Sequence, residues 1–199
     1  MLPGELLVSA SASGVVVFAH GSGSSRLSPR NAQVARALNG EGLATLLFDL
    51  LTGAEAVDRA NVFDVPLLAR RLGAARRWLR VQPEAEALPV GFFGASTGAA
   101  AALWAAAEEG ADVRAIVSRG GRPDLAGPRL GLVHAPTLLI VGGADELVLE
   151  LNRRALAELG SGEHELAVVP GATHLFEEPG ALERVAGLAA GWFTGHLRL

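Results

Sequence analysis

The amino-acid sequence predicts one α/β domain, in which helices cover both faces of a mostly parallel sheet of about seven strands. The chain is 199 residues long and half hydrophobic, which is enough for one substantial core but short for two ordinary domains. Short runs rich in Val, Leu, Ile and Phe alternate with longer segments of helical period, and this alternation is typical of βαβ units. We therefore expect residues 1–199 to form a single domain.

The expected strands are the short apolar runs, and in a parallel sheet they should be buried on both faces. All but the first are followed by a loop and, in most cases, by a helix. These runs cover residues 6–10, 15–19, 44–48, 89–94, 113–118, 137–141 and 165–169.

The expected helices begin at recognisable caps. Ser28 followed by Pro29 predicts a helix start, and Gly40 marks its end. Asp64 predicts the start of a second helix, whose apolar residues recur at three- and four-residue steps while its arginines lie elsewhere. Apolar stripes predict further helices over residues 148–159 and 182–192. Residues 50–61 and 120–135 show no period, so we expect loops there, beside the functional site.

Composition excludes several classes of function. The net charge is −4, and the 17 basic residues, all arginines, are dispersed, so no nucleic-acid partner is expected. The absence of cysteine removes disulfides, thiolate metal sites and a cysteine nucleophile, which leaves oxygen nucleophiles and histidine. Residues 1–10 do not resemble a secretory signal, and no apolar run approaches the ~18 residues of a membrane span, so we expect a cytoplasmic protein without a membrane partner.

One serine has the surroundings of a catalytic nucleophile. The sequence GASTG at residues 94–98 is the only G-x-S-x-G match in the chain and places Ser96 at its centre. An apolar run precedes it and an alanine-rich helical run follows, which is the strand-turn-helix setting of a nucleophile elbow. The flanking glycines suit a turn too tight for side chains. The sequence therefore predicts Ser96 at the carboxyl edge of the sheet, at a helix N-terminus that stabilises negative charge.

A serine nucleophile needs a base, and the base needs an orienting acid. Asp145 follows the expected strand 137–141, and His174 follows the strand 165–169. Both therefore lie on the same rim of the sheet as Ser96, and the order Ser, Asp, His is the one found with a nucleophile elbow. Asp145 could also cap the helix that follows it. We predict a catalytic triad of Ser96, Asp145 and His174.

Backbone N–H groups are expected to bind the oxyanion of the transition state. The sequence HGSG at residues 20–23 follows the strand 15–19, where a loop supplies one such donor, and the residue after the nucleophile supplies the other. We assign these donors to Ser22 and Thr97. His20 is expected to brace this loop.

Several motifs together cover nearly the whole chain: HGSGSSR at 20–26, SPRN at 28–31, FDLLT at 48–52, GASTG at 94–98 and SRGGRPD at 118–124, with the segments of Asp145 and His174. In these motifs the chain resembles the small dienelactone-hydrolase-like members of the α/β-hydrolase superfamily. The resemblance implies hydrolysis of ester-type bonds in a small molecule, with no metal and no organic cofactor. Dienelactone hydrolases proper use a cysteine nucleophile, so the lactone substrate is not carried over. No inserted segment is long enough for a large lid, which indicates an open site.

Other interpretations stay open. Arg26, Arg119 and Arg122 lie near strand ends, where a guanidinium could hold a substrate carboxylate, although pairing with Asp49 or Asp124 is the interpretation we favour. A dinucleotide-binding oxidoreductase would explain the glycines after the first long strand, but an arginine occupies the third glycine position. A catalytically silent binding module is the other alternative. The sequence leaves the oligomeric state and the choice among esterase, thioesterase and acyltransferase open.

Overall fold

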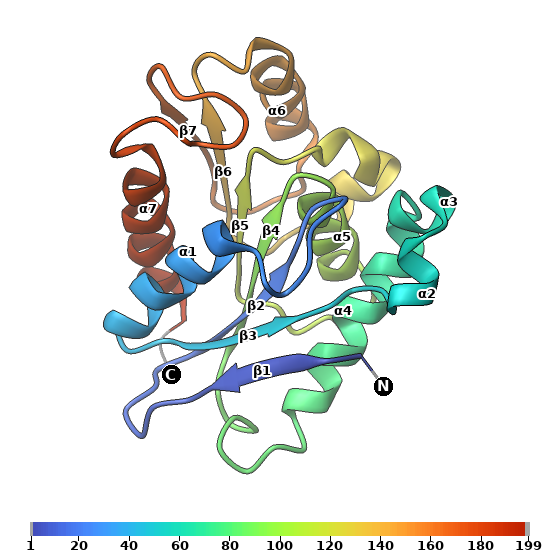
Figure 1. Cartoon of the computed structure of the whole chain (residues 1–199), viewed down its shortest axis with the longest axis vertical. Coiled ribbons are helices and arrows are strands. Elements are labelled where there is room, and N and C mark those ends of the chain that lie inside the picture. The colour runs from blue at the N-terminus through green and yellow to red at the C-terminus, as the bar shows by residue number, and fades with distance from the viewer. Residues whose placement is uncertain (1, 198–199) are drawn as a thin grey trace.

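A seven-stranded sheet organises the protein in a computed structural model, which describes residues 2–197 (Figure 1). The strands are β1 (Gly4–Leu7), β2 (Val15–Ala19), β3 (Ala44–Phe48), β4 (Val90–Ala95), β5 (Ala115–Arg119), β6 (Thr137–Gly142) and β7 (His164–Val169). Their order across the sheet is β1-β3-β2-β4-β5-β6-β7. Strand β1 is antiparallel to β3, and the other neighbouring pairs are parallel. The predicted α/β class and mostly parallel sheet are confirmed.

The helices are α1 (Pro29–Gly40), α2 (Gly53–Ala56), α3 (Arg59–Val62), α4 (Val65–Leu79), α5 (Thr97–Ala106), α6 (Glu146–Glu158) and α7 (Ala181–His196), with a 3-10 segment, η1 (Pro123–Leu132). Helices α1 and α4 begin at the caps that the sequence predicts. Ser28 caps α1 by accepting from the Asn31 N–H, and Asp64 caps α4 by accepting from the Leu67 N–H. No helix within residues 2–197 combines the length and apolar character that crossing a membrane requires.

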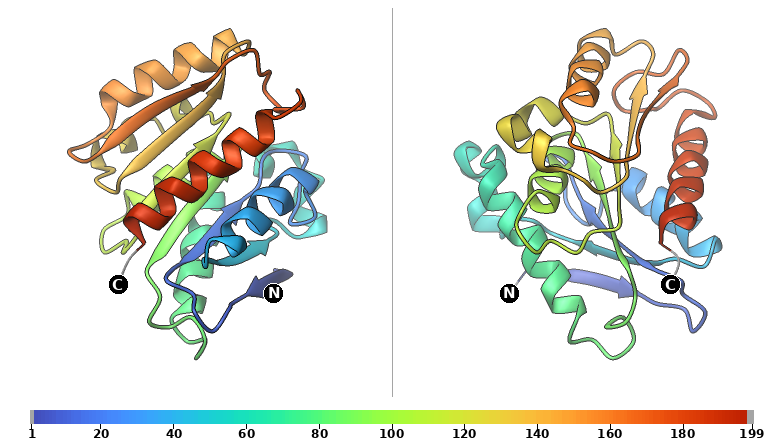
Figure 2. Two further views of the ribbon diagram at one scale, coloured as in Figure 1. Left: turned by 90° about the vertical axis from the view of Figure 1, so that its left-hand side faces the viewer. Right: turned by 180° about the vertical axis from the view of Figure 1, so that it is seen from behind.

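The helices form two layers, one on each face of the sheet (Figure 2). Helices α1 and α7 pack on one face, and α4, α5 and α6 cover the other. Because successive strand residues point to opposite faces, Phe92 enters the core beneath α4 and α5, whereas Phe93 enters the core beneath α1 and α7. Strands β2, β4, β5 and β6 are buried throughout, as predicted. The edge strands β1 and β7 are partly exposed.

Three local expectations were wrong. The first strand covers Gly4–Leu7 rather than residues 6–10, because its pairing with β3 sets the register from Gly4 opposite Phe48. The segment expected as a loop after β3 holds the short helices α2 and α3. Thr52 and Glu55 form a reciprocal capping box that starts α2. The second expected loop, residues 120–135, contains η1.

Candidate active site

Ser96 lies in a strained turn between β4 and α5. Its backbone has φ 51° and ψ −120°, a conformation that non-glycine residues rarely adopt. The glycines on either side are required by close packing. A Cβ on Gly94 would lie 2.7 Å from the Ala99 nitrogen, and one on Gly98 would overlap the carbonyl oxygen of Ala19. The turn therefore fixes Ser96 at the carboxyl edge of the sheet, half-buried, at the start of α5.

His174 and Asp145 form a hydrogen bond at the same edge. The Nδ1 atom of His174 lies 2.7 Å from Oδ2 of Asp145. Asp145 occupies the N-cap position of α6, but its side chain makes no capping hydrogen bond and is engaged by the histidine instead. The Asp145 side chain is only 15% exposed, so little water competes for its carboxylate. An Nδ1–H that donates to Asp145 leaves the other ring nitrogen, Nε2, free to accept a proton.

The loop that follows β5 hydrogen-bonds to Ser96 and passes beside the His174 ring. The Ser96 N–H donates to the Arg119 carbonyl, and the Arg122 N–H donates to the Ser96 carbonyl, both over 3.1 Å. A Cβ on Gly120 would lie 3.5 Å from Cε1 and Nδ1 of His174. Within the described part of the chain, Ser96 Oγ and His174 share no hydrogen bond. Such bonds are often long before substrate binds.

The two residues expected to bind an oxyanion face one cavity. Thr97 is the first residue of α5, so the helix itself provides no acceptor for its backbone N–H. Ser22 lies in the turn after β2 and lines the same cavity as Thr97. The loop passes close to the nucleophile, since a Cβ on Gly21 would lie 3.1 Å from the Ser96 Cβ. The structure thus brings Ser22 and Thr97 together beside Ser96.

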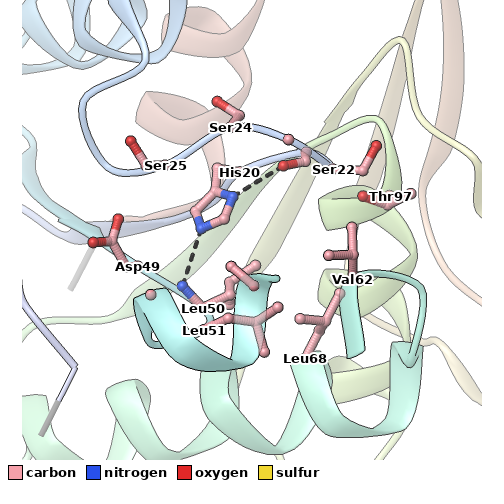
Figure 3. Close-up of a pocket in the computed structure, with 14 residues that line it drawn as sticks. His20, Ser22, Ser24, Ser25, Asp49, Leu50, Leu51, Val62, Leu68 and Thr97 are labelled. Carbon is pink, nitrogen blue, oxygen red and sulfur yellow. Dashed lines mark hydrogen bonds between the residues drawn. The ribbon is translucent and has the colours of Figure 1, made fainter. Parts of the chain in front are cut away.

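His20 connects this loop to the segment after β3. The Leu50 N–H donates to Nε2 over 3.0 Å, so Nδ1 carries the proton and donates to the Gly21 carbonyl, also over 3.0 Å (Figure 3). Burial lowers the pKa of His20 from its ordinary value of 6.5, although the hydrogen bond to Gly21 opposes this. The Leu50 N–H can donate to Nε2 only when the His20 ring is neutral. His20 therefore has the bracing position expected from the sequence.

The cavity beside Ser96 has a polar mouth and an apolar floor (Figure 3). Its volume is about 310 Å³. Serines from the β2–α1 loop and Asp49 lie at one side, while apolar side chains from the segment after β3, α2, α3 and α4 form the floor. Those apolar residues are Leu50, Leu51, Ala56, Val62 and Leu68. Figure 3 shows Val62 between Leu68 and Thr97, so the floor leads toward the residue expected to bind the oxyanion.

The three arginines considered as substrate ligands differ in their partners. Arg26 donates to Asp49 through its backbone N–H (2.7 Å) and through Nη1 (2.6 Å). Arg122 forms two hydrogen bonds with Asp124, of 2.8 and 2.7 Å. The carboxylate pairing that the sequence analysis favoured thus occurs at Arg26 and Arg122. Arg119 is only 8% exposed, and within residues 2–197 its Nε and Nη1 atoms have no hydrogen-bond partner.

Sequence reasoning missed the cavity floor. Its residues come from a segment interpreted as a loop, and the T-x-x-E pattern of Thr52 and Glu55 was the signal that could have identified a helix there. The asparagine and arginine at the start of α1, Asn31 and Arg30, were treated only as part of a motif, although both carry buried polar atoms. No group of three or more His, Asp and Glu side chains is placed to hold a metal ion in the described part of the chain.

Comparison with known proteins places this chain in one family. The model of the dienelactone hydrolase family matches residues 4–190. A Mycobacterium tuberculosis protein, named provisionally as a phosphoribosyl transferase, is 64% identical over 194 residues, which cover 98% of this chain but 44% of that protein. The chain thus spans less than half the length of this curated relative.

Solved structures agree with the family match. A dienelactone hydrolase from Anabaena variabilis is 55% identical, with a TM-score of 0.95 over 99% of this chain and 93% of that one. Est1E from Butyrivibrio proteoclasticus, solved with ferulic acid, has a TM-score of 0.82 at 16% identity over 98% of this chain and 95% of that one. The second likeness shows only a shared fold. The chain has the α/β-hydrolase fold and belongs to the dienelactone hydrolase family.

Proposed function

We propose that this protein is a serine hydrolase that cleaves carboxylic esters or thioesters of small molecules through an acyl-enzyme on Ser96. The observation that carries the proposal is the 2.7 Å hydrogen bond between His174 Nδ1 and Asp145 Oδ2, at the edge of the sheet where Ser96 lies in its strained turn. The dienelactone hydrolase family match supports hydrolysis as the reaction class. Cysteine is absent from the chain, so the nucleophile at this turn is a hydroxyl.

The proposed reaction needs no group from outside the chain except water. Ser96 Oγ attacks the acyl carbonyl carbon while its proton moves to Nε2 of His174. The N–H groups of Ser22 and Thr97 donate to the resulting oxyanion, and Asp145 stabilises the imidazolium. Collapse breaks the bond to the leaving alcohol or thiol, which receives the proton from His174. Water then attacks the acyl-enzyme and gives a proton to His174. The bond between the acyl carbon and Ser96 Oγ breaks, His174 returns the proton to Oγ, and the carboxylic acid leaves.

We place the acyl group of the substrate in the cavity of Figure 3. Thr97 and Ser22 line that cavity, so an acyl carbon bonded to Ser96 Oγ lies at its mouth. The floor is apolar, and the volume of about 310 Å³ suits a short acyl chain or a small ring. The cavity lining contains one carboxylate, Asp49, and no arginine, which favours uncharged acyl groups.

Two alternatives remain as outcomes of the test. A silent binding module would keep the fold without turnover. A dinucleotide-binding oxidoreductase would use Asp49 to bind a ribose, but that carboxylate already accepts two hydrogen bonds from Arg26. Phosphoribosyl transfer is not proposed, because more than half of the relative so named lies outside the match.

The test compares hydrolysis of p-nitrophenyl acetate by the wild type, by Ser96→Ala and by the control Ser161→Ala. Ser161 is an exposed serine whose hydroxyl contacts His134. We expect Ser96→Ala to lower kcat/KM at least about a thousandfold and Ser161→Ala to leave it unchanged. Circular dichroism checks that both variants fold. Equal rates for wild type and a folded Ser96→Ala variant would refute the role of Ser96.

A further inference from the structure

Arg119 is a buried cation that has no anionic partner among the described residues. It ends β5, its side chain is among the few charged ones in the core, and 8% of the residue is exposed. Neither Nε nor Nη1 finds an acceptor among residues 2–197, and both are sealed from solvent. Its third nitrogen, Nη2, is not among these sealed atoms. Since buried charges in proteins are normally paired, this guanidinium needs an explanation.

Its charged neighbour is a second arginine. Because side chains alternate along a strand, Arg119 points to the same face as Val117, which packs in the core beneath α1 and α7. Arg30 lies in the first turn of α1. Burial and, to a lesser extent, the positive charge of Arg30 together lower the pKa of Arg119 to about 10. Arg119 therefore stays a cation at neutral pH.

The ion pair between Arg30 and Glu177 does not neutralise the charges of Arg30 and Arg119. Its Nη1 donates to Oε1 of Glu177 over 3.1 Å, but the Glu177 side chain is 65% exposed, so water screens the contact. Its Nε is buried and has no partner in the described chain. The N-terminus of α1, a helix of 12 residues, adds positive potential at the same place. Two guanidinium groups thus lie close enough to repel each other, and the carboxylate that pairs with Arg30 is exposed.

We propose that Arg119 and Arg30 bind a small oxyanion, a phosphate or carboxylate group, between the end of β5 and the first turn of α1. Guanidinium groups donate two parallel hydrogen bonds to either group, and such charge-assisted bonds are strong. The bound anion supplies a negative charge that residues 2–197 do not place beside Arg119. The site does not depend on chemistry at Ser96. Arg119 precedes Gly120, where an added Cβ would lie 3.5 Å from the His174 ring, so an anionic part of a substrate could also occupy the site.

The test measures the thermal unfolding midpoint of the wild type during a titration with inorganic phosphate, with chloride keeping the ionic strength constant. Variants Arg119→Met and Arg30→Met remove the two guanidinium groups. Arg36→Met is the control, because Arg36 is exposed on the same helix. We expect phosphate to raise the wild-type and Arg36→Met midpoints saturably. In Arg119→Met and Arg30→Met we expect the apparent phosphate affinity to be roughly tenfold weaker or lost.

If Arg119→Met fails to fold, Arg119→Lys replaces it, because lysine keeps the charge and loses the two-pronged geometry. We expect a weakened response to phosphate in that variant too. A wild-type midpoint that responds to phosphate no more than to chloride would overturn the proposal. An equal phosphate response in the wild type and in either Arg119 variant would overturn it as well.

A kinetic experiment distinguishes the two possible occupants of the site, an anionic part of the substrate and a free anion. If the site holds an anionic part of the substrate, phosphate competes with an ester that carries a free carboxylate and leaves p-nitrophenyl acetate unaffected. If the site holds a free anion, phosphate raises the unfolding midpoint and competes with neither ester. Both results support the site. The unfolding measurement needs no activity, so failure of the hydrolase proposal leaves it intact.

Discussion

The two sides of the candidate active site are held in different ways. On one side, the turn of Ser96 lies between buried residues of β4 and α5, where added side-chain atoms would overlap backbone. On the other side, α2 and α3 contain no buried residue and reach the cavity through a few side chains, among them Val62. The comparison indicates that backbone packing fixes the proposed nucleophile, whereas the cavity wall can change at little cost to the fold.

The largest difference between the two sides is expected for glycine substitutions. In Gly98→Ala the new methyl group would overlap the Ala19 and His20 carbonyls, and the pairing of β2 with β4 prevents Ala19 from moving. We expect a loss of about 3 kcal/mol or more in the free energy of unfolding, or no folded protein. Gly53→Ala, at the start of α2, meets open space and should change it by less than about 1 kcal/mol. Urea unfolding measures both. Equal losses would show that the two sides are not packed differently.

At the edge of the sheet where Ser96 lies, Asp145→Asn tests whether the orientation of His174 matters to the reaction. The amide would present a donor or a weaker acceptor to Nδ1, so the ring would lose the tautomer that leaves Nε2 free. We expect kcat for p-nitrophenyl acetate to fall by about 10³ to 10⁴. The neighbouring exposed acid provides a control, since Glu146→Gln should leave kcat unchanged. A loss below tenfold in Asp145→Asn would contradict the proposed role.

On the side formed by α2 and α3, Val62→Ala should change substrate preference rather than the rate of bond cleavage. It removes two methyl groups from the cavity floor and lengthens the space available to an acyl chain. We expect kcat/KM for p-nitrophenyl hexanoate to rise roughly three- to tenfold relative to the acetate. Val57→Ala is the matched control, because Val57 is 85% exposed and does not line the cavity. An unchanged ratio would place the acyl group elsewhere.

The smallest effect concerns His20, which joins the two sides through the Leu50 N–H and the Gly21 carbonyl. Burial lowers its pKa in the folded state, so below pH 6.5 the unfolded chain binds the proton more readily than the folded chain. The free energy of unfolding should therefore fall as the pH drops through 6.5. We expect this fall to be smaller in His20→Gln, measured by urea unfolding at several pH values. The surface variant His134→Gln should behave like the wild type, and a wild-type slope in His20→Gln would contradict this account.

Much of the fold could be predicted because the sequence patterns that specify its strands and helix starts are local. Strands such as β2 and β3 appear in the sequence with their observed bounds, since a buried parallel strand is a nearly continuous apolar run. Caps at Ser28 and Asp64 place the starts of α1 and α4. The turn of Ser96 follows from the requirement for small residues on both sides of it.

The remainder depends on contacts between distant segments. The bounds of β1 follow from pairing with β3, which the sequence of residues 4–10 does not encode alone. The helices α2 and α3 are four residues each, too short to show a hydrophobic period. Which arginine finds a carboxylate depends on the segment that the fold brings beside it, so Arg26 and Arg119 look alike in sequence and differ in the folded protein.

Covalent labelling of the folded wild type with a fluorophosphonate, followed by intact mass and peptide mapping, tests whether Ser96 is the activated nucleophile. We expect a single adduct on Ser96, absent in Ser96→Ala and formed much more slowly in Asp145→Asn, because the probe reacts only with a serine activated by its base. A folded wild-type protein that stays unlabelled, or that is labelled on another serine, would contradict the account and favour a catalytically silent binding module.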